Sequence, residues 1–252
     1  MTTRPRVYRT EAIVLRRMDL GEADRLLTLF TPFQGKVKAI AKGVRRPGSK
    51  KSGHLEPFTR SRLLLARGRN LDIITQAEAL DHFPNLQGDL ERLGAAAYII
   101  ELIDRFTVED GRAEPLYDLL AAALVQLNEG TPLPSLTRYF ELRLLDQVGY
   151  RPQLFECVAC HQEIQPQDQY FSAADGGIMC PRCGQRQERA LRISLAALKV
   201  LRHYQRSSFE VAVAPEVRPQ VHAELDELME SYLTYLLERR LNAPDFLRRV
   251  RE

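Results

Sequence analysis

The chain has 252 residues, of which 44% are hydrophobic and 27% charged, a composition typical of an ordinary globular protein with two or three domains. It contains no apolar run of the roughly eighteen residues that a membrane-spanning helix needs, and its first residues lack the apolar segment of a secretory signal. We therefore expect no membrane partner and a cytoplasmic location.

The net charge of +3 hides an uneven distribution along the chain. Residues 1–80 hold 17 Lys and Arg against 7 Asp and Glu, whereas residues 81–252 hold 19 against 26. A basic first third on an acidic remainder predicts that the first domain binds a polyanion.

Residues 1–80 have the sequence pattern of a β domain. Apolar or alternating segments are separated by turn signals rich in glycine and proline, and they lie at 7–15, 26–31, 36–41, 58–66 and 71–77. Five short strands in so short a segment indicate a small barrel, for which the OB-fold is the five-stranded candidate. A small open sheet packed on the following helices would give a similar pattern.

The densest charge lies at 42–51, where half of the ten residues are basic and none is acidic. Glycine, proline and serine favour a mobile loop here. Few aromatic residues are available for base stacking, so backbone contacts and weak sequence preference are expected. A solvated basic loop is the alternative interpretation. The residues predicted to contact nucleic-acid phosphates are Lys36, Lys38, Lys42, Arg45, Arg46, Lys50, Lys51, Arg60 and Arg62.

Candidates for catalysis are few. The chain has no zinc-protease HExxH motif, no recognisable Ser-His-Asp arrangement and no phosphate-binding GxxxxGK(S/T) loop, so we expect no enzymatic activity. Asp19, Glu22 and Asp24 could hold a divalent ion in a nuclease. The simpler interpretation is a turn in which Glu22 or Asp24 pairs with a neighbouring arginine.

After residue 84 the apolar period becomes helical. Amphipathic helices are predicted over about 85–106, between Pro115 and Gly130, and up to Gly149. Helix resumes after the cysteine segment, with Ser194 as an N-cap and Pro219 at the start of a long helix. The helical segments are expected to form one bundle with a cysteine module inserted. The expected divisions are 1–80 for the barrel, 81–149 and 187–252 for the two parts of the helical domain, and 150–186 for the module.

All cysteines fall into two Cys-x-x-Cys pairs, Cys157 with Cys160 and Cys180 with Cys183, with nineteen residues between the pairs. Such pairs can place four thiolates tetrahedrally around one ion, which predicts a zinc-ribbon-type site. Protein thiolates would fill every position, so we expect one structural Zn2+. Disulfide pairing is the alternative, which a reducing cytosol disfavours.

Several segments have sequences typical of one known family. They follow in the same order over essentially the whole chain, and they are 10–15, 21–31, 35–46, 71–78 and Gly149-Tyr-Arg-Pro152. Together they resemble the bacterial recombination mediator RecO. The resemblance implies an N-terminal OB-fold, a helical domain and, in many members, a zinc module inside it. It also implies a DNA repair protein that is not an enzyme and is associated with the nucleoid.

The resemblance further implies partners. RecO proteins bind single- and double-stranded DNA, anneal complementary strands, and work with RecR and often RecF. They help RecA replace single-stranded DNA-binding protein (SSB), whose acidic C-terminal tail contacts the helical domain. By position, Lys36, Lys38, Lys42, Arg45 and Arg46 would touch phosphate. The main alternative is an RNA-binding translation or ribosome-associated factor built from a small barrel and a zinc ribbon.

Overall fold

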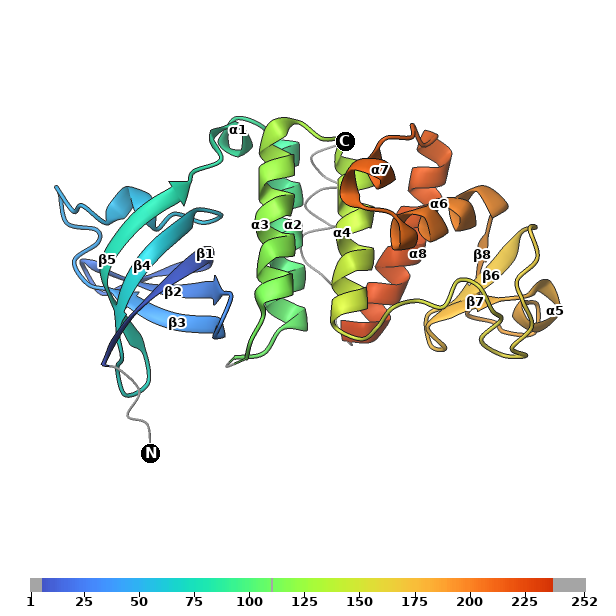
Figure 1. Ribbon diagram of the computed structural model, residues 1–252, viewed down its shortest axis with the longest axis horizontal. Coiled ribbons are helices and arrows are strands. Elements are labelled where there is room, and N and C mark those ends of the chain that lie inside the picture. Colours follow the sequence, from blue (N-terminus) through green and yellow to red (C-terminus); the bar gives the residue numbers. More distant parts are fainter. Residues whose placement is uncertain (1–5, 110, 238–252) are drawn as a thin grey trace. The chain divides into compact units, whose positions relative to one another are not determined.

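The computed structural model describes residues 6–109 and 111–237 (Figure 1). The described residues divide into two compact units, the first ending at Glu129 and the second beginning at Gly130. The first unit contains a β-barrel followed by helices, and the second contains the cysteine module between further helices. No helix among these residues is long and apolar enough to cross a lipid bilayer.

Five strands form a closed barrel in the first unit, as the sequence predicts. They are β1 (Val7–Leu20), β2 (Asp24–Thr31), β3 (Gly35–Ala41), β4 (Arg60–Ala66) and β5 (Asp72–Asp81). Their order around the barrel is β1-β2-β3-β5-β4, and only the pair of β3 with β5 is parallel. A small five-stranded barrel of this kind is the OB-fold architecture, so the predicted fold class is confirmed.

Strand β1 is buried on both faces in its middle. Ala12 and Val14 belong to the apolar cluster inside the barrel, together with side chains from the four other strands. Ile13 points to the opposite face because side chains alternate along a strand, and it is also fully buried. It lies opposite Phe30 of β2, whose ring centroid is 6.4 Å from that of Tyr117 in the helical part of the unit. The helices therefore cover part of the barrel's outer surface.

The basic loop between β3 and β4 is anchored by apolar side chains. Val44 and Leu55 are fully buried and belong to the apolar cluster inside the barrel. At the start of the loop, the Gly43 N–H group donates to Asp24 Oδ1 at 2.7 Å. The composition of this segment favours a mobile loop, yet the segment follows a defined path because two of its side chains are buried in the apolar cluster.

The single helix predicted over 85–106 is interrupted. A one-turn helix, α1 (Pro84–Gln87), is followed by α2 (Leu90–Phe106). Asp89 begins the second helix by accepting hydrogen bonds from two backbone N–H groups of its first turn, at 3.0 and 3.1 Å. Helix α3 (Glu114–Glu129) packs beside α2 (Figure 1). Apolar residues keep their helical spacing across the break between α1 and α2, so the spacing of apolar residues alone does not reveal the break.

The second unit contains a helical bundle. Helix α4 packs against α6, α7 and α8, so the last helix before the cysteine module packs with the helices after it, whereas α2 and α3 belong to the first unit. Ser194 caps α6 by accepting a hydrogen bond from the Ala197 N–H group at 3.2 Å, and Pro219 opens α8. The bounds are α4 (Leu133–Gln147), α6 (Leu195–Arg206), α7 (Phe209–Val213) and α8 (Pro219–Leu237).

The cysteine module is inserted between α4 and α6. Its three strands pair in the antiparallel order β7-β6-β8, and the second cysteine pair lies at the short helix α5. A turn joins β6 to β7, where Ser172 Oγ donates to Asp175 Oδ2 at 2.6 Å. The bounds are β6 (Gln169–Ser172), β7 (Gly177–Met179), α5 (Pro181–Gly184) and β8 (Leu191–Ile193).

Candidate metal centre and nucleic-acid interface

The four cysteine sulfur atoms gather at one point of the second unit. All lie within 4.8 Å of one another, and the Sγ atoms of Cys160 and Cys180 are 3.9 Å apart. None forms a disulfide. Metal–sulfur bonds of ~2.3 Å in a tetrahedron place sulfur atoms ~3.8 Å apart. The quartet therefore fits a single ion held by four thiolates.

Backbone hydrogen bonds fold each cysteine pair into a tight loop. In the first pair, the His161 N–H group donates to the Cys157 carbonyl at 2.8 Å. In the second pair, the Cys183 N–H group donates to the Cys180 carbonyl at 3.0 Å. The Cys180 N–H group also donates to Cys157 Sγ at 3.3 Å, which links the two loops. The imidazole of His161 is exposed and lies outside the sulfur cluster.

Gly184 allows the second loop to pack closely on strand β6. A Cβ atom at this position would lie 2.4 Å from the side chain of Tyr170, well inside van der Waals contact. Only a residue without a side chain fits there without displacing the tyrosine.

The surroundings shift the pKa values of two of the cysteine thiols in opposite directions. Burial opposes ionisation of Cys157, but N–H groups of Cys180, Cys160 and Ala159 lower its pKa to about 6. Hydrogen bonding to Cys180, assisted by burial, raises the pKa of Cys183 to about 12. One thiolate therefore forms readily at neutral pH, whereas Cys183 needs a cation that offsets the charge of its neighbours. Metal binding by this set releases protons.

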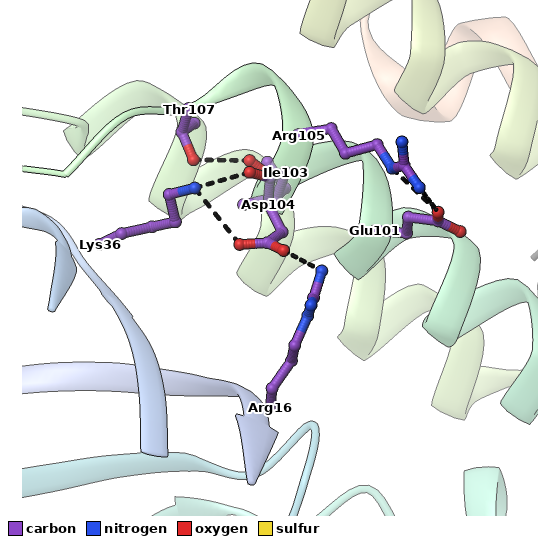
Figure 2. A network of polar contacts seen from close by, with 7 residues as sticks. All are labelled: Arg16, Lys36, Glu101, Ile103, Asp104, Arg105 and Thr107. Carbon is purple, nitrogen blue, oxygen red and sulfur yellow. Dashed lines mark hydrogen bonds and ion pairs between the residues drawn. The ribbon is translucent and has the colours of Figure 1, made fainter. Parts of the chain in front are cut away.

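Among the predicted DNA contacts, Lys36 is engaged with helix α2. Figure 2 shows Lys36 and Arg16 reaching the same residue, Asp104. Lys36 Nζ donates to the Asp104 backbone carbonyl at 2.6 Å and to its carboxylate at 3.3 Å, and the lysine side chain is 15% exposed. This lysine holds the helix against the barrel and presents little charge to a ligand.

Lys38 faces a second acid of the same region. Its Nζ atom lies 2.5 Å from Glu109, and the lysine lowers the pKa of the Glu109 carboxyl. Asp104 and Glu109 belong to the acidic remainder of the sequence and fold back onto the basic domain. Sequence reasoning missed both residues, because their positions in the chain carry no local signal of contact with β3.

Arg60 and Arg62 lie on one face of the barrel, as the alternation along β4 predicts. Arg60 donates to Glu11 at 2.7 Å and to Asp81 at 3.2 Å. Arg62 is more exposed and lies 3.7 Å from both Glu11 and Glu78. Carboxylates of the neighbouring strands thus offset the charge of both arginines.

Two cations of the loop between β3 and β4 turn back onto the barrel. Arg45 donates to the Gly21 carbonyl at 3.1 Å and lies 3.4 Å from Asp19. Lys51 Nζ donates to backbone carbonyls, among them that of Ile74 at 3.2 Å. Both side chains help to fix the loop.

The remaining cations of this loop are Lys42, Arg46 and Lys50, which we call the loop cations. Their side chains are exposed, and none forms an ion pair with the described part of the chain. The structure therefore separates the nine predicted contacts into six that contact groups of the protein and three that face solvent.

The acidic cluster considered for a nuclease does not gather around a metal position. Arg25 pairs with Asp19 at 3.1 Å and with Glu56 at 2.9 Å, rather than with Glu22 or Asp24. Asp24 accepts a hydrogen bond from the Gly43 N–H group of the loop between β3 and β4. Over the described ranges, the cysteines form the only group of three or more His, Cys, Asp or Glu residues placed to hold a metal ion. The structural interpretation of the turn is therefore favoured.

Comparison with known proteins covers nearly the whole chain. Residues 5–83 match the model "Recombination protein O N terminal", and residues 87–245 match "Recombination protein O C terminal". A protein of Roseiflexus sp. strain RS-1 is 44% identical over 99% of this chain and 88% of its own length. One from Desulforudis audaxviator is 39% identical over 96% and 97%. One from Dehalococcoides mccartyi strain 195 is 36% identical over 94% and 93%. All three are named DNA repair protein RecO.

Proposed function

The chain belongs to the RecO family, and from this membership we propose that it is a non-enzymatic recombination mediator in DNA repair. It binds single- and double-stranded DNA and anneals complementary strands. With RecR, and with RecF where that protein takes part, it helps RecA replace SSB on single strands. It acts in the cytoplasm at the nucleoid, and its helical domain contacts the acidic C-terminal tail of SSB.

The observation that carries the DNA-binding part is the set of loop cations. Lys42, Arg46 and Lys50 are exposed and unpaired within the described chain, on a loop whose path is fixed by buried Val44. Cations on a loop with an anchored backbone neutralise phosphates without the cost of ordering the loop, and they release counterions. Annealing needs no covalent chemistry. Cations that screen the phosphate charge of two strands lower the repulsion between them, and base pairing supplies the specificity.

The roles that we propose are assigned to the segments expected from the sequence. Residues 1–80 bind DNA, residues 150–186 together with β8 form a metal-stabilised module, and the segments 81–149 and 187–252 supply the helices, of which α2 and α3 belong to the same unit as the barrel. The ion is Zn2+, because four thiolates in tetrahedral spacing suit zinc and leave no coordination position open for chemistry. Its role is structural.

The salt dependence of binding tests the role of the loop cations. The triple variant Lys42→Gln, Arg46→Gln, Lys50→Gln should flatten the plot of log affinity for single strands against log salt by roughly 2, since each phosphate contributes about 0.7. The matched control is Lys38→Gln, Arg60→Gln, Arg62→Gln, which removes the same charge from cations that are already paired. Equal slopes for the two triple variants would contradict the assignment.

An annealing assay tests the function as a whole. Complementary strands coated with SSB should anneal faster with the protein and RecR, and the loop-cation variant should be slower at equal protein concentration. Structured RNA that competes better than single-stranded DNA would favour the RNA-binding alternative. If the wild-type protein does not accelerate annealing, the result contradicts the proposed function.

A further inference from the structure

A second basic segment lies within the acidic remainder of the chain. Residues 180–206 contain seven Lys and Arg and only Glu188 as an acid. The segment begins at the second cysteine pair and ends with α6. The negative balance over residues 81–252 hides it, so the charge of the second unit is uneven as well.

The first part of this segment borders a cavity of about 520 Å³ in the second unit. Small residues of the turn between β6 and β7 line one side, and Ser231 and Tyr235 of α8 line another. Arg186 and Arg189 also line it, both exposed and without an ion pair in the described ranges. Pockets of this size accept ligands as large as a nucleotide.

The side chains around the cavity match the chemistry of a single-stranded nucleic acid. Tyr235 is 53% exposed and offers an aromatic face on which a base can stack. The guanidinium groups of Arg186 and Arg189 are suited to phosphate oxygens, which they can bind with paired hydrogen bonds. Glu188 is the one carboxylate in the lining, so the cavity retains a positive balance.

The cysteine loop sets the position of one of these arginines. The Arg186 N–H group donates to the Cys183 carbonyl at 3.2 Å, directly after α5. The backbone that presents the arginine is therefore continuous with the loop that presents a metal ligand. Ser231 and Tyr235 are four residues apart, so they lie on one face of α8.

We propose that this cavity binds one nucleotide of single-stranded DNA, with the base on Tyr235 and the phosphate at Arg186 and Arg189. The inference rests on the proposed function and extends it. The loop cations hold DNA on the first unit, and the cavity holds DNA on the second. A protein with two separate DNA contacts can keep two strands, or two parts of one strand, close together while they pair.

Three variants of the full-length protein separate the parts of this proposal. Arg186→Gln with Arg189→Gln should flatten the salt slope for single-stranded DNA by roughly 0.7, because the two arginines share one phosphate. Tyr235→Leu should weaken binding about tenfold at fixed salt with an unchanged slope, because stacking depends little on salt. Tyr235→Phe keeps the aromatic face and should restore most of the affinity.

The matched control is Arg218→Gln, which removes one exposed charge just before the start of α8. At 1.5 Å per helical residue, this position lies roughly 25 Å along the axis from Tyr235. The salt slope of Arg218→Gln should change less than that of the variant that combines Arg186→Gln with Arg189→Gln. Thermal melting of each variant shows whether the fold is retained, and Tyr235→Phe is informative even if Tyr235→Leu is unstable.

The outcomes distinguish this inference from the proposed function. If the loop-cation variant changes the slope but the arginine pair and Tyr235 variants do not, the cavity does not bind DNA and the proposed function stands. If those variants lose binding of an acidic peptide instead, the cavity is a protein-binding site and the inference is wrong. If only the cavity variants change DNA binding, the inference holds and the assignment of the loop cations fails.

Discussion

The barrel and the cysteine module are both small β structures, yet they are held together differently. The barrel closes around fully buried apolar side chains from all five strands. The module has strands of three or four residues and buries only a few large side chains, such as Phe171, Ile178 and Ile193. A sheet so small buries too little apolar surface to stand alone. Apolar burial therefore stabilises the barrel, whereas coordination by four sulfurs takes over much of that role in the module.

Removing the metal should have the largest effect and should act on the module. Cys157→Ser with Cys160→Ser leaves two thiolates, and we expect the second unit to lose about 5 kcal/mol or more, because metal binding at structural sites is coupled to folding. Metal content and thermal unfolding measure the change. Ala159→Ser is the control, since it alters the same loop and keeps all four sulfurs. A double variant that melts like the wild type would contradict a structural role for the metal.

Metal retention should depend on pH in one direction. The pKa of Cys157 is lowered from 9.0 to about 6 in the folded protein. A lowered pKa means that the thiolate's stabilising contribution is complete above the unfolded value and is lost as pH falls through the folded one. We therefore expect release of the ion to a colorimetric chelator to increase as pH falls from 7 towards 5. Retention that stays constant over this range would oppose the assignment.

A cavity in the barrel core should be the next largest perturbation and should leave the metal in place. Leu29 is fully buried inside the barrel, so Leu29→Ala should cost about 3 kcal/mol through lost burial and an unfilled cavity. Leu26→Ala on the same strand is the control, because this side chain is only partly buried. Denaturant unfolding and metal analysis measure the two effects. Loss of the metal in the Leu29 variant would show that the barrel and the module are not independent.

A single methyl group in the module should have an intermediate effect. In Gly184→Ala the new Cβ atom would lie 2.4 Å from Tyr170, and relieving this overlap should cost about 2 kcal/mol. Gly53→Ala is the control in the barrel loop, where nothing lies within 4 Å of the added atom. Thermal melting should show a clear decrease for the first variant and little change for the second. Equal melting temperatures would mean that β6 can shift without cost.

Replacing one paired cation or one loop cation should have the smallest effects. The first replacement should change stability, and the second should change the salt dependence of DNA binding. Lys36→Gln should cost about 1 kcal/mol of stability through its lost bonds to Asp104, with an unchanged salt slope for DNA. Lys50→Gln should leave stability unchanged and lower the slope by about 0.7. If Lys36→Gln flattens the slope as much as Lys50→Gln, the separation into paired and free cations is wrong.

Local patterns in the sequence determined much of this protein. Apolar or alternating segments between turn signals predicted the five strands, because each strand buries apolar side chains in the barrel. The two cysteine pairs predicted the metal ligands, because each Cys-x-x-Cys unit is a local turn whose backbone positions both sulfurs. The N-cap at Ser194 and the helix start at Pro219 were also local features. Each depends on residues close together in the chain.

Only the tertiary structure decided which charges remain free. Lys36 and Lys50 look alike in the sequence, but one lies against Asp104, 68 residues further along the chain, and the other faces solvent. The interruption of the helix at Asp89 and the burial of Val44 beneath a basic loop were hidden in the same way. So was the cavity that brings Arg186 and Tyr235 together, two residues separated by most of the second helical segment. A charge acts on whatever lies near it in space, and contacts between distant segments exist only once the chain has folded.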